Sequence, residues 1–129
     1  MSKRVVFVDD SKTVLRSVEL AVEGLVDSGT IELITFSNPM EFLDEIKTGS
    51  FDYDLLFTDI NMPQMNGLEL SKELKTIEDI KKKPILALTT ENSSEIKQTG
   101  KEIGITGWVV KPFSEQKIIM AIKRVLRIR

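Results

Sequence analysis

The 129-residue chain contains no cysteine and no histidine. The absence of cysteine excludes disulfides, thiol nucleophiles and cysteine-ligated zinc or iron–sulfur centres. The absence of histidine removes the commonest general base of enzymes, so a Ser-His-Asp triad is excluded as well. Any chemistry of this chain therefore uses carboxylates, hydroxyls, lysine, or a hard cation held by oxygen ligands.

Long apolar runs and a strong net charge are also missing. No apolar run approaches the roughly 18 residues of a membrane span, and the four apolar residues 5–8 are too few for a signal-peptide core. The 18 Lys+Arg and 20 Asp+Glu give a net charge of −2, which disfavours non-specific binding to nucleic acid. The basic clusters at 81–83 and 117–129 are interpreted as solvated faces, or alternatively as a partner-facing patch. We expect a cytoplasmic protein that binds neither nucleic acid nor membranes.

Short apolar segments alternate with amphipathic ones along the chain. Five segments rich in Val, Ile and Phe predict buried strands: 4–8, 31–36, 54–58, 84–88 and 105–110. Apolar residues at helical spacing predict helices between and after them: over 14–25, from Asn38 onward, over 70–77, over 93–103, and from 118 to the C-terminus.

Two of these helices carry local signals. Asn38 is placed to cap the second helix, with Pro39 at its first position and Glu41 placed for a reciprocal capping contact. The fourth helix, 93–103, is weak, because Gly100 interrupts it at a cost of about 1 kcal/mol relative to alanine. Low local stability is typical of elements that move, although a frayed surface helix explains the pattern equally well.

Five strand–helix repeats predict an α/β fold with a parallel sheet covered by helices on both faces. No linker or low-complexity tract divides the chain, so we expect a single domain over 1–129 without an output domain. In doubly wound sheets, ligands bind outside the carboxyl ends of the strands. The residues that directly follow each strand are therefore the candidates for function.

Charged and hydroxyl side chains gather at these strand ends. Three carboxylates, a hydroxyl and an ammonium follow four of the five strands: Asp9, Asp10, Asp59, Thr89 and Lys111. Two carboxylates about 5 Å apart repel each other by roughly 3 kcal/mol at an effective dielectric near 20. A cation relieves this repulsion, and oxygen ligands without His or Cys favour Mg²⁺, or Mn²⁺.

Each of these residues has a purely structural alternative. An Asp or Thr after a strand can cap the next helix, and a Lys can simply be solvated. Taken together, the set suits transfer of a phosphoryl group to a carboxylate, since a cation, an ammonium and a hydroxyl stabilise its oxygens. A glycine-rich phosphate loop of the GxGxxG or GxxxxGK[ST] type is absent from the sequence.

Four blocks of sequence carry a resemblance to a known family. They are Val-Asp-Asp-Ser at 8–11, Phe-Thr-Asp-Ile-Asn-Met-Pro at 57–63 with Gly67, Leu-Thr-Thr-Glu at 88–91, and Gly-Trp-Val-Val-Lys-Pro-Phe at 107–113. In this order and spacing, the chain resembles over its whole length the receiver domain of two-component response regulators, and most closely the stand-alone chemotaxis type. The resemblance implies a flavodoxin-like sheet with strand order 2-1-3-4-5.

The resemblance also implies roles for single residues. Asp59 matches the phosphoacceptor, which takes its phosphoryl group from the phosphohistidine of a sensor or chemotaxis kinase. Asp10, Asp59 and the backbone carbonyl of Asn61 match the Mg²⁺ ligands, with Asp9 acting through water. Thr89 matches the hydroxyl that turns toward the phosphoryl group, and Lys111 the ammonium that pairs with it, followed by a cis peptide bond to the proline.

Further positions match the switch and the lifetime determinants of the family. Trp108 stands at the switch aromatic, commonly Tyr or Phe, and an indole N–H needs a partner when buried. Asn61 and Glu91 match positions that control water access and phosphatase action, as in proteins that lose phosphate quickly. Thr90 stands where many members of the family have a smaller residue, and its side chain hinders the access of water to the phosphoryl group. Because Asn61 with Glu91 and Thr90 act on the phosphorylated lifetime in opposite directions, the sequence predicts no dephosphorylation rate.

The resemblance thus predicts a phosphorylated signalling switch rather than an enzyme with turnover, although one that assists its own phosphorylation and dephosphorylation. Its expected partners are a histidine kinase, the flagellar motor switch and a phosphatase. A lone receiver in a phosphorelay, or one acting as a phosphate sink, is the alternative. A flavin-binding fold is disfavoured by the acidic rim. An aspartyl phosphatase is disfavoured because its nucleophile follows the first strand in an Asp-x-Asp pattern, whereas Asp9 and Asp10 are adjacent.

Overall fold

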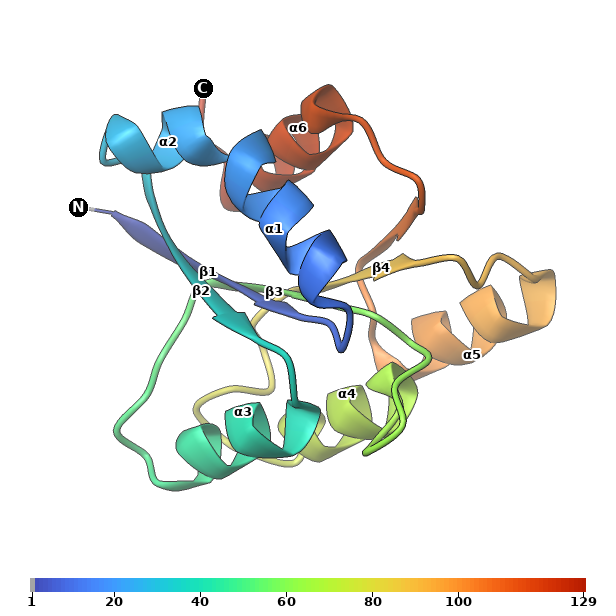
Figure 1. The fold of residues 1–129 in the computed structure, drawn as a ribbon. Helices are drawn as coiled ribbons and strands as arrows, with labels where there is room; N and C mark the ends of the chain where they lie inside the picture. Colours follow the sequence, from blue (N-terminus) through green and yellow to red (C-terminus); the bar gives the residue numbers. More distant parts are fainter. Residues whose placement is uncertain (1) are drawn as a thin grey trace.

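The computed structural model describes residues 2–129, which form one five-stranded parallel sheet with helices on both faces (Figure 1). The strands are β1 (Lys3–Val8), β2 (Ile31–Phe36), β3 (Leu55–Thr58), β4 (Ile85–Thr89) and β5 (Gly107–Val110). The helices are α1 (Lys12–Ala21), α2 (Glu23–Asp27), α3 (Pro39–Lys47), α4 (Gly67–Lys75), α5 (Ser94–Ile103) and α6 (Glu115–Leu126). The strand order β2-β1-β3-β4-β5 is the predicted one.

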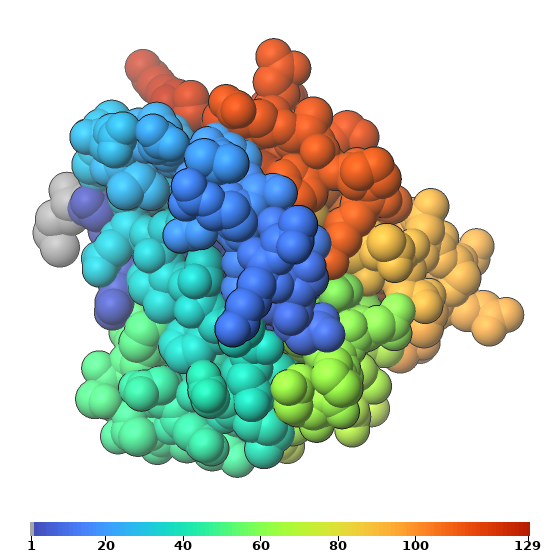
Figure 2. Space-filling model, in the orientation of Figure 1, coloured from blue at the N-terminus to red at the C-terminus, as the bar shows by residue number. Residues whose placement is uncertain are grey.

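Two apolar layers hold the helices on the sheet. Residues of α1 and α6 pack with one face of β1, β3 and β4, where the rings of Phe7 and Phe57 stack at 4.3 Å. Residues of α3 and α4 pack on the other face, where Phe42 and Tyr53 are nearly inaccessible to solvent. The central strands β3 and β4 are buried along their whole length, as the apolar sequence runs predicted. Figure 2 shows α5 projecting at one side of the molecule.

The predicted single helix over 14–25 is wrong, because the chain bends at Val22 and forms α1 and α2 instead. Val22 has φ −103° and ψ 7°, outside the helical range, and its side chain is fully buried. Gly24, two residues further on, is the weakest helix former of the segment and favours the interruption.

The predicted helix ends also differ in three places. Asn38 caps α3 by accepting a hydrogen bond from the N–H of Met40, but within residues 2–129 no reciprocal contact from Glu41 forms. Ile77 lies in the turn after α4 rather than in the helix. The last helix stops at Leu126, because Arg127 adopts a left-handed conformation and Ile128 turns back onto the apolar layer.

Within residues 2–129, none of the helices is both long and apolar enough to cross a membrane. The switch in strand order lies between β1 and β3, whose carboxyl ends are neighbours in the sheet. That edge of the sheet is the expected position for a ligand site.

Candidate functional site

The carboxyl ends of β1 and β3 bring three carboxylates together. Asp9 and Asp10 follow β1, and Asp59 follows β3, whose register pairs Val8 with Thr58. One carboxylate oxygen of each Asp lies within 4.8 Å of the others. Asp9 and Asp59 are buried, whereas Asp10 is exposed. The predicted convergence of the three acids is therefore present.

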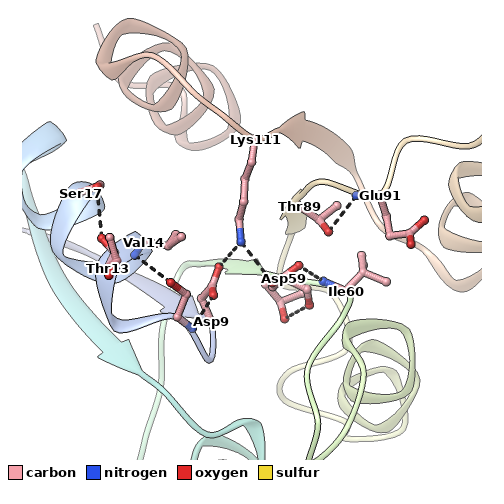
Figure 3. A network of polar contacts seen from close by, with 11 residues as sticks. Asp9, Thr13, Val14, Ser17, Asp59, Ile60, Thr89, Glu91 and Lys111 are labelled. Carbon is pink, nitrogen blue, oxygen red and sulfur yellow. Dashed lines mark hydrogen bonds and ion pairs between the residues drawn. The ribbon is translucent and has the colours of Figure 1, made fainter.

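Lys111 supplies the positive charge of this cluster. Its ammonium points between Asp9 and Asp59 (Figure 3). Nζ lies 2.7 Å from Oδ2 of Asp9 and 3.1 Å from Oδ2 of Asp59. The side chain of Lys111 is only 14% exposed, and it reaches the acids from the end of β5 across the carboxyl edge of the sheet. Its peptide bond to Pro112 is cis, as the resemblance implied.

Burial and charge act in opposite directions on these groups. Burial raises the pKa of the Asp9 carboxyl, and the hydrogen bonds from Lys111 and from the N–H of Ser11 lower it only in part. Burial lowers the pKa of Lys111, but hydrogen bonds and the charges of Asp9 and Asp59 outweigh it, so its pKa is raised overall. Lys111 therefore stays a cation at neutral pH.

Hydrogen bonds to both carboxylate oxygens hold the side chain of Asp59 in one orientation. Oδ1 accepts a hydrogen bond from the N–H of Ile60 at 2.7 Å, and Oδ2 accepts from Lys111. Gly67 packs against the backbone of the same residue, where a Cβ would overlap the carbonyl oxygen of Asp59. The N–H of Gly67 also donates to the carbonyl of Ile60 at 2.8 Å. This close approach was not deduced from the sequence, which showed Gly67 only as part of a motif.

Thr89 lies fully buried at the end of β4. Its Oγ1 accepts a hydrogen bond from the N–H of Glu91 at 3.2 Å, and its carbonyl accepts one from the N–H of Lys111 at 2.9 Å. The threonine is thus part of the same rim as Asp59 and Lys111 (Figure 3). Thr90, the next residue, is exposed.

Glu91 connects the strand-end residues of the site to Trp108. Its carboxylate accepts a hydrogen bond from Nδ2 of Asn61 at 3.0 Å, and its backbone carbonyl accepts one from Nε1 of Trp108 at 2.6 Å. The indole N–H therefore has the partner that the sequence required of it. The sequence placed Asn61 and Glu91 near the site, but it gave no indication that Glu91 contacts both Asn61 and Trp108.

The residues fit a hard divalent cation. Carboxylate oxygens are the ligands that Mg²⁺ prefers, and three acids at this separation repel one another unless a cation lies among them. Lys111 relieves part of this repulsion at Asp9 and Asp59, whereas Asp10 has no such partner within residues 2–129.

Comparisons with known proteins agree with this geometry. Residues 5–123 match the family model described as the response regulator receiver domain. The chain is 32% identical to a chemotaxis protein CheY homolog of Campylobacter jejuni, covering 95% of this chain and 92% of that one. It is 27% identical to the sensor histidine kinase CheAY of Helicobacter pylori, over 96% of this chain and 15% of that protein.

Solved structures show the same fold. The chemotaxis protein CheY4 of Vibrio cholerae superposes with a TM-score of 0.85 at 36% identity, covering 97% of this chain and 99% of that one. Family model, relatives and structure all cover nearly the whole chain. The chain therefore belongs to the response regulator receiver domain family, and it is a CheY-type signalling phosphoacceptor.

Proposed function

We propose that the chain takes a phosphoryl group on Asp59 from the phosphohistidine of a chemotaxis histidine kinase. The observation that carries this proposal is the placement of the Asp59 carboxylate, which is buried, oriented by Ile60, and 3.1 Å from the ammonium of Lys111. Asp9 is also buried and contacts Lys111, so within residues 2–129 these features select the pair Asp9 and Asp59. The match of Asp59 to the phosphoacceptor position of the receiver-domain family favours Asp59 of the two.

In the proposed transfer, an oxygen of Asp59 attacks the phosphorus, the new P–O bond forms, and the P–N bond to the kinase histidine breaks. Lys111 then pairs with the phosphoryl oxygens, and the hydroxyl of Thr89 donates to them. Asp10, Asp59 and the backbone carbonyl of Asn61 would hold Mg²⁺, with Asp9 acting through water. The cation supplies neutralising charge to the phosphoryl oxygens. Hydrolysis reverses the state when water displaces the carboxylate of Asp59 from phosphorus.

The experiment is transfer of labelled phosphate from a phosphorylated chemotaxis kinase to the chain. Label should appear on the wild type with Mg²⁺ and disappear with EDTA. Asp59→Asn should take none, whereas Asp44→Asn, which changes an exposed carboxylate of α3, should behave as the wild type. Equal labelling of the Asp59→Asn variant would refute the assignment.

We further propose that the phosphorylated chain signals through the face made by α5, β5 and α6 to the flagellar motor switch. Similar chains that are named as chemotaxis proteins support the flagellar motor switch as the partner. On this face a hollow of about 790 Å³ between β5 and α6 is lined by Trp108 and by the basic residues Lys117, Arg124 and Arg127, among others. Binding of a motor-switch protein should increase when beryllofluoride and Mg²⁺ are added.

A single domain that serves a phosphorelay or a phosphate sink is the second candidate. The observation that favours it is the match of this chain to 15% of a sensor histidine kinase, which places a similar segment within a kinase. In that case beryllofluoride leaves motor-switch binding unchanged, while phosphate moves from the chain back to a kinase histidine.

A further inference from the structure

The indole of Trp108 lies between β5 and α5 with two sets of contacts. Its Nε1 donates to the backbone carbonyl of Glu91 at 2.6 Å. Its ring packs against the apolar layer that also contains Ile105. The hydrogen bond therefore fixes one edge of the indole, and the position of the other edge depends on what lies beneath it.

Gly100 of α5 lies beneath that other edge. A Cβ built on Gly100 would lie 2.8 Å from Cζ3 and 3.6 Å from Cη2 of Trp108, and 3.4 Å from Cδ1 of Ile105. The first distance is shorter than carbon atoms tolerate, so a side chain at position 100 and the present indole position exclude each other.

No other feature of position 100 calls for glycine. Its backbone is helical without a positive φ, and its carbonyl accepts from the N–H groups of Gly104 and Ile105, which a side chain would not affect. Glycine inside a helix is otherwise unfavourable relative to alanine, because it loses more backbone entropy on folding. Among the nearest neighbours of Gly100 within residues 2–129, the indole is the one whose present position requires the missing side chain.

We propose that Gly100 is a positioning residue that determines where the indole of Trp108 lies. The vacant side-chain position lets the six-membered part of the ring enter beneath α5, and this placement brings Nε1 to the carbonyl of Glu91. Because Glu91 also contacts Thr89 and Asn61, the placement links β5 to the phosphorylation site. The inference deepens the proposed function and rests on it for that last link.

The test starts from the single tryptophan of the chain, whose fluorescence and indole N–H signal report one position. In Gly100→Ala the emission should shift to longer wavelength, acrylamide should quench it more strongly, and the indole N–H should exchange about tenfold faster once its hydrogen bond is lost. An Ala variant with the emission, quenching and exchange of the wild type would overturn the proposal.

Two further variants separate the ring contact from a general effect on the helix. Gly24→Ala is the matched control, since a Cβ at Gly24 meets no atom within 4 Å, and it should leave all three signals unchanged. Trp108→Tyr removes the ring atoms nearest Gly100. In that background Gly100→Ala should raise the unfolding midpoint, whereas with Trp108 it should not. Equal shifts of the midpoint in both backgrounds would contradict the ring contact.

A final arm distinguishes this inference from the proposed function. Beryllofluoride with Mg²⁺ should change the Trp108 emission of the wild type and change that of Gly100→Ala less. A wild type without any response would refute the link to phosphorylation and count against the proposed function. The ring placement is judged separately, because its signals are recorded without a phosphoryl donor.

Discussion

The ammonium of Lys111 links two carboxylates from different strand ends, at 2.7 Å from Oδ2 of Asp9 and 3.1 Å from Oδ2 of Asp59. Along the chain, Lys111 is 102 positions from Asp9 and 52 positions from Asp59. The lysine thus stabilises a concentration of negative charge that the fold creates when it aligns β1 with β3. It also neutralises part of the negative charge that a divalent cation would otherwise neutralise.

Replacing this lysine should therefore change two properties in opposite directions. Lys111→Met should lower the free energy of unfolding by about 3 kcal/mol without Mg²⁺, because buried acids lose their partner. The same variant should bind Mg²⁺ more tightly, since the competing ammonium is gone. Urea unfolding with and without Mg²⁺, together with calorimetric titration, measures both effects.

The control for this variant is Lys117→Met, which removes an exposed charge from α6 and should leave both quantities within about 0.5 kcal/mol of the wild type. A Lys111→Met variant that binds Mg²⁺ more weakly than the wild type would contradict the competition between the two cations.

Gly67→Ala should displace Asp59, because the new Cβ would overlap the carbonyl oxygen of that residue. We expect a loss of about 2–4 kcal/mol in unfolding free energy, in the range of overpacked or strained core positions. Mg²⁺ affinity should fall with it, since a displaced Asp59 no longer faces Asp10. Unchanged stability and Mg²⁺ affinity would show that the loop after β3 relaxes without moving the site.

The Asn61–Glu91 hydrogen bond of 3.0 Å should make the two side chains act as one unit on phosphate lifetime. Asn61→Ala and Glu91→Ala should each change the dephosphorylation rate, and the double variant should change it no further than the larger single effect. Glu91→Ala keeps the backbone carbonyl that Trp108 uses, so the Trp108 emission should stay unchanged. Strictly additive effects on the rate would show that the pair is not coupled.

Tyr53 should make the fold sensitive to alkali. Burial raises the pKa of its hydroxyl, and the charge of Asp52 adds to the shift. Because the unfolded chain releases this proton near pH 10 and the folded chain retains it, the contribution to stability is complete below about pH 10 and is lost above it.

Tyr53→Phe removes this alkaline loss. Among residues 2–129 no group forms a hydrogen bond with the buried Tyr53 hydroxyl, so the variant should also be as stable as the wild type at pH 7, or up to about 1 kcal/mol more stable. Thermal unfolding between pH 7 and pH 11 measures the difference. Parallel curves for both proteins would contradict the role of the buried hydroxyl.

The sequence was informative wherever one local rule decides the structure. Apolar runs such as 31–36 and 54–58 predicted β2 and β3 to within a residue, because buried parallel strands contain little else. The acids at the strand ends were predicted to converge because parallel strands share one carboxyl edge. One carboxylate oxygen each of Asp9, Asp10 and Asp59 lies within 4.8 Å of the others, and Lys111 contacts two of the three, which confirms that convergence.

Local capping signals were less reliable than the apolar runs, because the capping box of α4 between Asn66 and Glu69 was missed and a similar one was wrongly expected at Glu41.

Features that depend on long-range packing were not predictable from the sequence. Gly100 was interpreted as a weak point of its helix, whereas the structure places it against the indole of Trp108. Such a contact depends on the relative positions of α5 and β5, which no local pattern specifies.

The proposals above depend on Asp59 as the phosphoacceptor. The most direct test is to treat the chain with acetyl phosphate and Mg²⁺, reduce the acyl phosphate with borohydride, and identify the reduced residue by mass spectrometry of peptides. Reduction is expected at Asp59 alone, and no reduction is expected when EDTA replaces Mg²⁺. Reduction at Asp9 or Asp10, or at Asp59 without any divalent cation, would contradict it.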